Sequence, residues 1–205
     1  MISDSCVDNG GTAFMHLRNT RTSYGWVTII IHWLMAVVIF FMFGLGLWMR
    51  TLGYYDTWYH AAPELHKSVG MLLLMLLLFR WLWRVSNTRP DLMGKVWEQF
   101  IALVLHNMHY VLLAALMISG YFIPTAEGVG VDVFGWFTVP ALATFSKETT
   151  DLIGVMHRYL AWSAVSLACL HAAAALKHHI IDKDRTLLRM LGVSRKTKEE
   201  KEIIS

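Results

Sequence analysis

Charged residues are scarce in this sequence. Only 16% of the 205 residues are Asp, Glu, Lys or Arg, while 56% are hydrophobic. A soluble domain typically has about 25% charged and about 45–50% apolar residues. Intrinsic disorder is excluded, because a disordered chain combines low hydrophobicity with high charge. An ordinary soluble domain is also a poor match, so the distribution of the apolar residues along the chain becomes the informative feature.

Cysteine is nearly absent as well. Cys6 and Cys169 are the only two, too few and too badly placed for a disulfide framework. The sequence contains no C-x-x-C-H motif, which excludes covalent attachment of a c-type haem. Cys169 lies within an apolar block, and we expect it to be a small buried hydrophobic residue.

The apolar residues are gathered into four blocks. They cover residues 26–49, 65–85, 100–123 and 152–176. A helix needs about 20 apolar residues to cross a bilayer core. The second block contains Lys67, Arg80 and Arg84, but long basic side chains near the ends of a span can reach the interfaces. The sequence therefore predicts an all-α integral membrane protein with a bundle of four transmembrane helices.

The polar segments at both ends are expected to lie outside this bundle. We assign residues 1–25 to an N-terminal tail, residues 26–192 to the membrane domain and residues 193–205 to a charged C-terminal tail. The first apolar block is expected to be a retained helix and not a secretory signal, because a long polar stretch precedes it. Residues 1–14 show no periodicity, and Met15 is an alternative start.

Basic residues are distributed unequally between the two sides of the predicted bundle. Of the 18 Lys and Arg residues, 14 lie before the first block, from the end of the second block to the start of the third, or after the fourth. Because basic loops stay in the cytoplasm, we expect both termini to be cytoplasmic and the loops 50–64 and 124–151 to face outward. The basic residues follow membrane topology, so the net charge of +3 does not indicate nucleic-acid binding.

Histidine is the residue type that points to function. Six of the ten histidines lie within the apolar blocks or at their edges: His32, His66, His106, His109, His157 and His171. Ionisable side chains inside a membrane are costly, so each of them is a candidate functional residue.

Two of these histidines lie on one face of the fourth predicted helix. His157 and His171 are 14 residues apart, which separates them by roughly 21 Å along the axis. Depth in the bilayer then pairs His66 with His157 near the outer side and His32 with His171 near the inner side. Two facing imidazoles suit a planar cofactor with two axial positions, and haem b fits that description. Four-helix bundles hold such cofactors between facing helices.

The residues alone leave the inner pair open. His106 and His109 lie at a similar depth in the third block, and either could replace His32 or could hydrogen-bond to a neighbouring helix. Small residues in the blocks could leave room for a porphyrin or serve plain helix packing. They include Gly44, Gly46, Gly70 and Gly120.

Several motifs carry a resemblance to a known family. They are Ile31-His32-Trp33, Pro63-Glu64-Leu65-His66-Lys67-Ser68-Val69-Gly70, the run from Leu170 to His179, Asp182-Lys183-Asp184 and Thr186-Leu187-Leu188-Arg189-Met190. On these motifs, residues 20–192 resemble the bacterial cytochrome b561 family, close to its branch of unassigned homologues. The resemblance implies a multi-pass protein of the bacterial inner membrane, with a four-helix fold and two haem b groups.

The resemblance also implies ligands and an activity. His32 and His171 match the ligands of the inner haem and His66 and His157 those of the outer haem, which favours His32 over His106. Related haem subunits place a quinone near the inner haem, so ubiquinone or menaquinone is the implied second cofactor. One activity known in the family is oxidation of superoxide on the outer side, with electrons passed to ubiquinone. The chain is therefore expected to be an oxidoreductase with a one-electron donor in the periplasm.

Other polar residues are candidates for the quinone and for the outer side. His178 and His179 lie just beyond the fourth block and could give protons to a quinone, because an unperturbed imidazole titrates close to neutral pH; the resemblance favours His178. Asn107 could hydrogen-bond to a quinone carbonyl. Lys67 and Arg158 each follow an expected outer ligand and could pair with haem propionates or attract superoxide, although six acidic residues outnumber four basic ones on that side.

Two other functions remain open from the sequence. The chain could be a haem b membrane anchor for a separate periplasmic redox partner docked on the loop 124–151, and the resemblance suggests an isoprenoid-binding protein as that partner. A histidine-lined metal or proton transporter is the other alternative. It would require acidic residues along a path through the membrane, and no Asp or Glu lies in the core of any predicted span.

Overall fold

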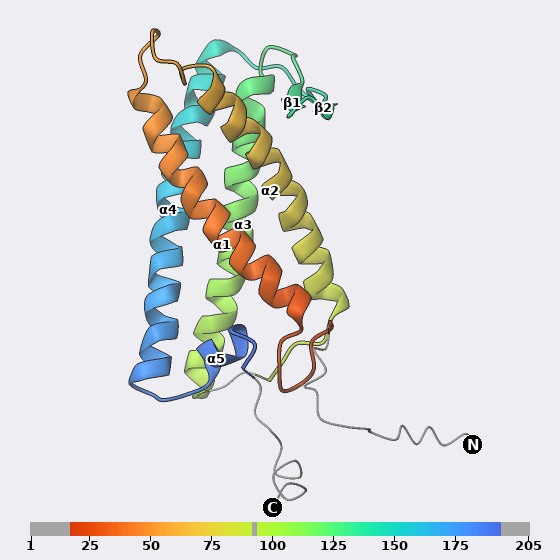
Figure 1. Cartoon of the computed structure of the whole chain (residues 1–205), viewed down its shortest axis with the longest axis vertical. Coiled ribbons are helices and arrows are strands. Elements are labelled where there is room, and N and C mark those ends of the chain that lie inside the picture. Colours follow the sequence, from red (N-terminus) through yellow and green to blue (C-terminus); the bar gives the residue numbers. More distant parts are fainter. Residues whose placement is uncertain (1–16, 92–93, 194–205) are drawn as a thin grey trace, which may run out of the picture.

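The computed structural model describes residues 17–91 and 94–193. The expectations for residues 1–14, for Met15 as a start and for the charged tail from residue 194 onward lie outside this range. Within it, four helices are long and apolar enough to cross a membrane. They are α1 (Trp26–Trp48), α2 (Ala61–Ser86), α3 (Val96–Thr125) and α4 (Lys147–Ile180) (Figure 1). The predicted four-helix membrane bundle is confirmed.

Most of these helices are longer than the apolar blocks that predicted them. The α4 helix has 34 residues, and α2 has 26 although its uninterrupted apolar run is short. Helical hydrogen bonds continue into the interfacial regions, where polar and charged residues are tolerated, so hydropathy alone underestimates the length. A short 3-10 turn (Met49–Thr51) follows α1.

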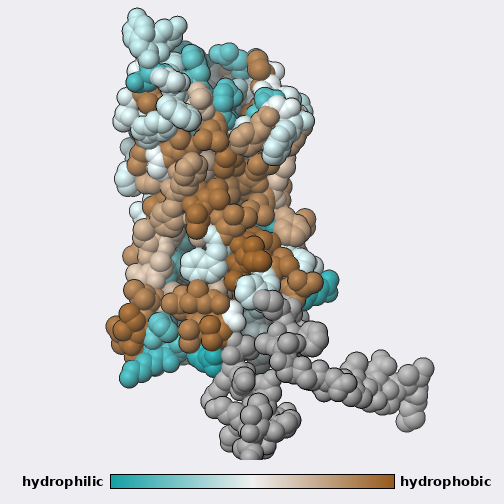
Figure 2. Space-filling view, in the orientation of Figure 1, coloured by the Kyte–Doolittle hydropathy of each residue, from teal (hydrophilic) through white to brown (hydrophobic). Residues whose placement is uncertain are grey.

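The outer surface of the helices is apolar. On the face shown in Figure 2, hydrophobic residues cover most of the middle of the molecule, and hydrophilic residues lie toward both ends. Val37, Val111 and Leu170 expose 66%, 70% and 67% of their surface, which is favourable against lipid and unfavourable against water. Cys169 is also exposed; our expectation that it is buried is wrong, because its side of α4 faces away from the neighbouring helices.

The larger cluster of buried apolar side chains lies between α1 and α2. Met35, Leu73 and Leu77 are almost completely buried there, and apolar side chains of α3 complete the cluster. The α3 helix packs along both α2 and α4, whereas α1 and α4 make few direct contacts.

One end of the bundle, termed here the hairpin end, carries an element that the sequence did not predict. Strands β1 (Val131–Val133) and β2 (Phe137–Val139) form a small antiparallel hairpin with Val131 opposite Val139. The Ser68 hydroxyl of α2 donates to the Asp132 carbonyl and accepts from the Phe134 N–H, both at 3.3 Å. Val133 is fully buried, so the hairpin is a fixed cover beside α2 and α3.

The opposite end, termed the tail end, is closed by the short helix α5 (Thr186–Met190). The Trp33 indole N–H of α1 donates to the Met190 carbonyl at 2.8 Å. Gly192 has a positive φ of 77° and turns the chain so closely over Trp26 that a Cβ would lie 3.4 Å from that ring. These contacts place α5 under α1 and beside the end of α4 (Figure 1).

Candidate functional site

The six histidines of the apolar blocks lie in two groups at different depths. At the hairpin end, His66 of α2 faces His157 of α4, with ring centroids 6.3 Å apart. Toward the tail end, His32 of α1 faces His171 of α4 at 6.4 Å. The structure thus brings together the partners that the depth comparison had matched.

The His157 ring is held in one tautomer by α3. Its Nδ1 lies 3.0 Å from the Leu116 carbonyl oxygen and 3.1 Å from the Ser119 hydroxyl. Since a carbonyl can only accept, the proton is on Nδ1 and Nε2 keeps its lone pair. Ser119 escaped the sequence analysis, although a lone serine within an apolar block was a visible signal.

Two glycines allow these rings to approach neighbouring helices. A Cβ on Gly120 of α3 would lie 2.8 Å from Cε1 of His157, and a Cβ on Gly46 of α1 would lie 3.2 Å from Cε1 of His66. Nδ1 of His66 is buried and has no hydrogen-bond partner within the described range. The absence of a side chain at Gly46 and Gly120 therefore makes room for the two imidazoles.

The tail-end group contains four imidazoles. His106 and His109 of α3 lie 5.4 and 5.5 Å from His171, centroid to centroid. Nδ1 of His109 donates to the Leu105 carbonyl at 2.8 Å, and its Nε2 is buried without a partner among the described residues. The two alternatives that the sequence left open for the inner pair are thus both close to His171.

Arg80 of α2 is a site residue that the sequence analysis placed at the interface instead. Its Nη2 donates to Nδ1 of His32 at 2.9 Å, and its Nη1 lies 3.7 Å from the Met35 sulfur. The guanidinium therefore reaches between the helices. The sequence held no signal for this contact, because it depends on how α1 crosses α2.

The tail end of α4 carries a second polar cluster. His178 Nδ1 lies 2.8 Å from an Asp182 carboxylate oxygen and 3.2 Å from one of Asp184. The Lys177 ammonium, 2.6 Å from Asp182, holds the pKa of that carboxyl below its ordinary value. Together with Glu98 of α3, these side chains line an open polar cleft of about 540 Å³.

The remaining predicted site residues are Asn107, Lys67, Arg158 and His179. Asn107 Oδ1 accepts from Nη2 of Arg84 at 3.2 Å. Lys67 pairs with Glu64 at 2.6 Å, and the Arg158 guanidinium lies over the Tyr159 ring at 5.6 Å. Nδ1 of His179 is buried and lacks a hydrogen-bond partner in the part of the chain that the structure covers.

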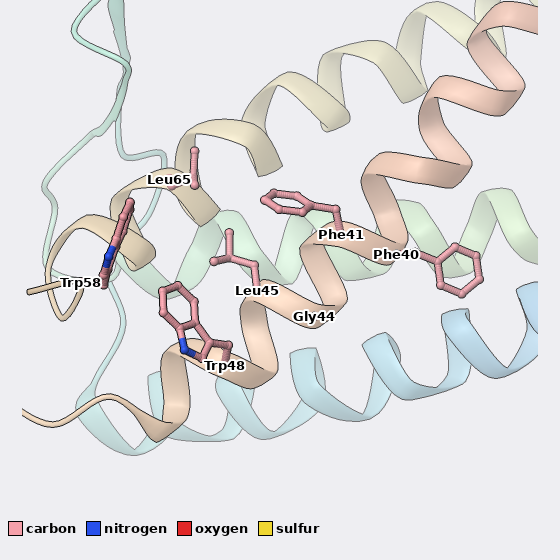
Figure 3. A pocket seen from close by; sticks show the side chains of 7 residues that line it. All are labelled: Phe40, Phe41, Gly44, Leu45, Trp48, Trp58 and Leu65. Carbon is pink, nitrogen blue, oxygen red and sulfur yellow. The ribbon is translucent and has the colours of Figure 1, made fainter. Parts of the chain in front are cut away.

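An apolar groove of about 520 Å³ lies at the hairpin end and is separate from the histidines. Its lining comes from the end of α1, the following loop and the start of α2 (Figure 3). The residues are Phe40, Phe41, Gly44, Leu45, Trp48, Trp58 and Leu65. Gly44 and Gly46 differ by about 200° around α1, so Gly44 faces the groove while Gly46 faces His66.

The spacing of the facing rings fits axial ligation of a haem. An imidazole nitrogen binds a first-row metal at about 2.0 Å and lies about 1.2 Å from the centre of its own ring, so two axial rings have centroids about 6.3–6.4 Å apart. His66 with His157 and His32 with His171 have this separation. The unpartnered Nδ1 of His66 and the glycine at each outer ring are also compatible with such a group. The fold and these pairs define a class: helical membrane proteins with histidine pairs stacked at two depths, of the kind that bind haem.

Comparison with known proteins identifies the family. Residues 23–193 match the family model described as prokaryotic cytochrome b561, and the chain belongs to this family. It is therefore a transmembrane haem b electron-transfer protein of the bacterial inner membrane, as the sequence motifs predicted. This assignment favours the cytochrome over the histidine-lined transporter.

Several relatives align along most of the chain. Cytochrome b561 homolog 2 of Escherichia coli (strain K12) is 50% identical over 182 residues, which cover 88% of this chain and 97% of the relative. A protein of Yersinia pestis named probable superoxide oxidase CybB is 30% identical over 84% of this chain and 97% of its own length. Cytochrome b561 homolog 1 of Escherichia coli (strain K12) is 27% identical over 80% and 93%, respectively.

Proposed function

We propose that this cytochrome binds two haem b groups and moves electrons across the membrane between a periplasmic one-electron partner and a quinone. His66 and His157 would hold the outer haem, and His32 and His171 the inner one. The observation that carries the proposal is the pair of centroid separations, 6.3 and 6.4 Å, at two depths on α4. The 14-residue spacing of His157 and His171 separates these depths by roughly 21 Å.

The same distances support His32 as the inner partner of His171. His106 and His109 lie about 1 Å closer to His171 than axial ligation of one iron requires. His109 Nδ1 is engaged by its own helix at Leu105. We therefore assign His106 and His109 to the wall of the inner site.

Each protein group has a definite task in this arrangement. A haem b held by these histidines would supply one-electron transfer chemistry. The Leu116 carbonyl fixes the tautomer of His157, so that Nε2 would be the atom available to ligate. The surrounding apolar side chains exclude water.

The tail end is proposed to face the cytoplasm. Most of the basic residues lie on this side, which is the side that positive residues occupy in bacterial inner-membrane proteins. The hairpin end, with β1 and β2, then faces the periplasm. The His66 and His157 pair lies on this side, within reach of a periplasmic donor.

Superoxide is a candidate donor on the outer side. The support is the relative named probable superoxide oxidase. Lys67 is paired with Glu64, and Lys147 with Asp151, so their charges are balanced. Arg158, directly after His157 and stacked on Tyr159, is the basic residue best placed to attract an anion there.

A separate periplasmic redox protein docked on the hairpin is the second candidate, because Trp136 is 73% exposed beside Phe134.

A quinone is the proposed inner acceptor. Its reduction takes two electrons and two protons, and the protons would come from the polar cleft at the end of α4. Asp182 and Asp184 hold Nδ1 of His178, which leaves Nε2 to exchange a proton. Asn107 could still donate through its amide N–H₂, since Arg84 uses only its oxygen.

The test is a reduced-minus-oxidised visible spectrum of the purified protein with a pyridine haemochrome count. We expect two low-spin b-type haems per chain. His66→Ala and His32→Ala should each remove one of them, whereas His60→Ala, in an exposed loop, should remove none. One haem in the unaltered protein, or two in His32→Ala, would contradict the ligand assignment, and His106→Ala would then be measured.

A further inference from the structure

Two arginines of α2 lie in the inner half of the bundle, beside the tail-end histidines. Arg80 and Arg84 are one helical turn apart and therefore share a face. Both guanidiniums lie over the ring of Tyr110 from α3, with Cζ at 5.8 and 4.9 Å from the centroid. Such stacking fixes the orientation of a guanidinium and leaves its N–H groups free to bind in its own plane.

The partners of these two cations are all neutral. Arg80 donates to His32 Nδ1 and contacts the Met35 sulfur, and Arg84 donates to Asn107. No carboxylate of the described residues pairs with either guanidinium. The α1 helix has no acidic residue, and the single acids of α2 and α3 are Glu64, near the hairpin end, and Glu98, which is engaged with the Lys95 N–H.

Positive charges within a membrane protein are costly and normally have an anionic partner or a route to water. Arg80 and Arg84 share a helix face, contact one tyrosine ring and have no acidic partner among the described residues. Together they form a site for an anion with two oxygens or for two carboxylates. Bidentate carboxylate binding is the interaction for which the planar guanidinium is best suited.

The hydrogen bond from Arg80 to His32 gives a second reason to expect an anion beside the two arginines. Arginine has only donors, so His32 Nδ1 accepts here and the ring proton must be on Nε2. A neutral histidine that ligates a metal through Nε2 carries its proton on Nδ1 instead. Arg80 cannot donate to Nδ1 of a His32 that ligates iron in this way, and its guanidinium then requires another acceptor close by.

We propose that Arg80 and Arg84 bind the propionate carboxylates of the inner haem. The proposal rests on the proposed function, in which His32 and His171 hold that haem. Haem b carries two carboxylates, which match the two positive charges and the planar donor sets of the two arginines. Tyr110 is then a positioning residue that orients both guanidiniums.

The test uses Arg80→Gln and Arg84→Gln, which remove a charge but keep a polar side chain of moderate length. Arg50→Gln is the matched control, because Arg50 is exposed at the hairpin end. The two midpoint potentials are measured by equilibrium redox titration, and the haem that depends on His32 is identified with His32→Ala. We expect Arg80→Gln to lower the potential of that haem alone, since a nearby positive charge stabilises the reduced form, and Arg50→Gln to change neither.

A redox-induced infrared difference spectrum separates carboxylate binding from a merely structural role. We expect the propionate carboxylate bands to shift in Arg80→Gln and Arg84→Gln and to stay unchanged in Arg50→Gln. Arg80→Lys, which keeps the charge, should restore haem content if Arg80→Gln loses it.

Unchanged potentials and unchanged carboxylate bands in both variants would overturn the arginine proposal while leaving two haems in place. So would equal shifts of both haems, or loss of haem that Arg80→Lys does not restore. Failure of the proposed function looks different, because the unaltered protein would then not contain two haems.

Discussion

Glycine at position 120 decides how close α3 can lie to the His157 ring. A Cβ there would be 2.8 Å from Cε1 and 3.3 Å from Nδ1, distances at which the imidazole has to move. Moving the ring would also break the bond from Nδ1 to the Leu116 carbonyl. At the scale of single residues, the outer site therefore depends on glycine at position 120 as well as on His66 and His157.

We expect Gly120→Ala to lose the outer haem, so that the pyridine haemochrome count falls to about half of the unaltered value. Gly44→Ala is the control, since a Cβ at this position meets nothing within 4 Å. Both changes raise helix propensity, so a difference between them reports on the site. Equal haem content in the two variants would show that the His157 ring does not need this space.

His178 is the residue whose change should separate quinone reduction from haem binding. In His178→Gln, reoxidation of the reduced protein by a ubiquinone analogue should slow by roughly 100-fold, the range in which loss of a proton donor falls. The haem spectrum should stay unchanged. Stopped-flow absorbance measures the rate, and His60→Gln, in the exposed outer loop, should react normally. A normal rate in His178→Gln would remove His178 from the mechanism.

At the scale of elements, the loop that follows β2 is hydrogen-bonded to α3 through the Tyr121 hydroxyl. Tyr121 donates to the Pro140 carbonyl at 2.6 Å and accepts from the Leu142 N–H at 3.0 Å, and its side chain is 6% exposed. A phenylalanine would leave both backbone groups unpaired next to a buried ring. The loop after β2 would then lose its fixed position over the end of α3.

Tyr121→Phe is expected to destabilise the protein by about 1–3 kcal/mol, the cost of leaving buried polar groups without a partner. The change should appear as a lower melting temperature in detergent and as faster amide exchange in residues 131–142. Tyr55→Phe provides the comparison, because Tyr55 is 98% exposed and should change neither. If the exchange of residues 131–142 is the same in both variants, the position of the hairpin does not depend on the Tyr121 hydroxyl.

At the scale of the whole molecule, the two ends of the bundle should lie on opposite sides of the membrane. We expect Tyr55→Cys to react with an impermeant maleimide in intact spheroplasts, in a background without Cys6 and Cys169. Arg89→Cys, in the exposed loop between α2 and α3, should react only after lysis. The reverse labelling pattern would invert the proposed orientation and place His178 in the periplasm.

The sequence by itself determined the class of the protein and the depth of its histidines. Four long apolar blocks require spanning helices because backbone groups cannot remain unpaired in lipid. The 14-residue spacing on α4 fixes two levels, because the helix rise is constant. The motifs around His32, His66 and His171 were sufficient to indicate the family.

The tertiary structure decided which side chains meet at each level. The Arg80 contact with His32, the Ser119 contact with His157 and the gathering of His106 and His109 at His171 depend on how the helices rotate and cross. Hydropathy carries little information on that rotation, since every helix is apolar on most of its circumference. The hairpin escaped prediction for a related reason: three-residue strands have too few alternating positions to form a pattern, and it is burial of Val133 against α2 and α3 that holds them.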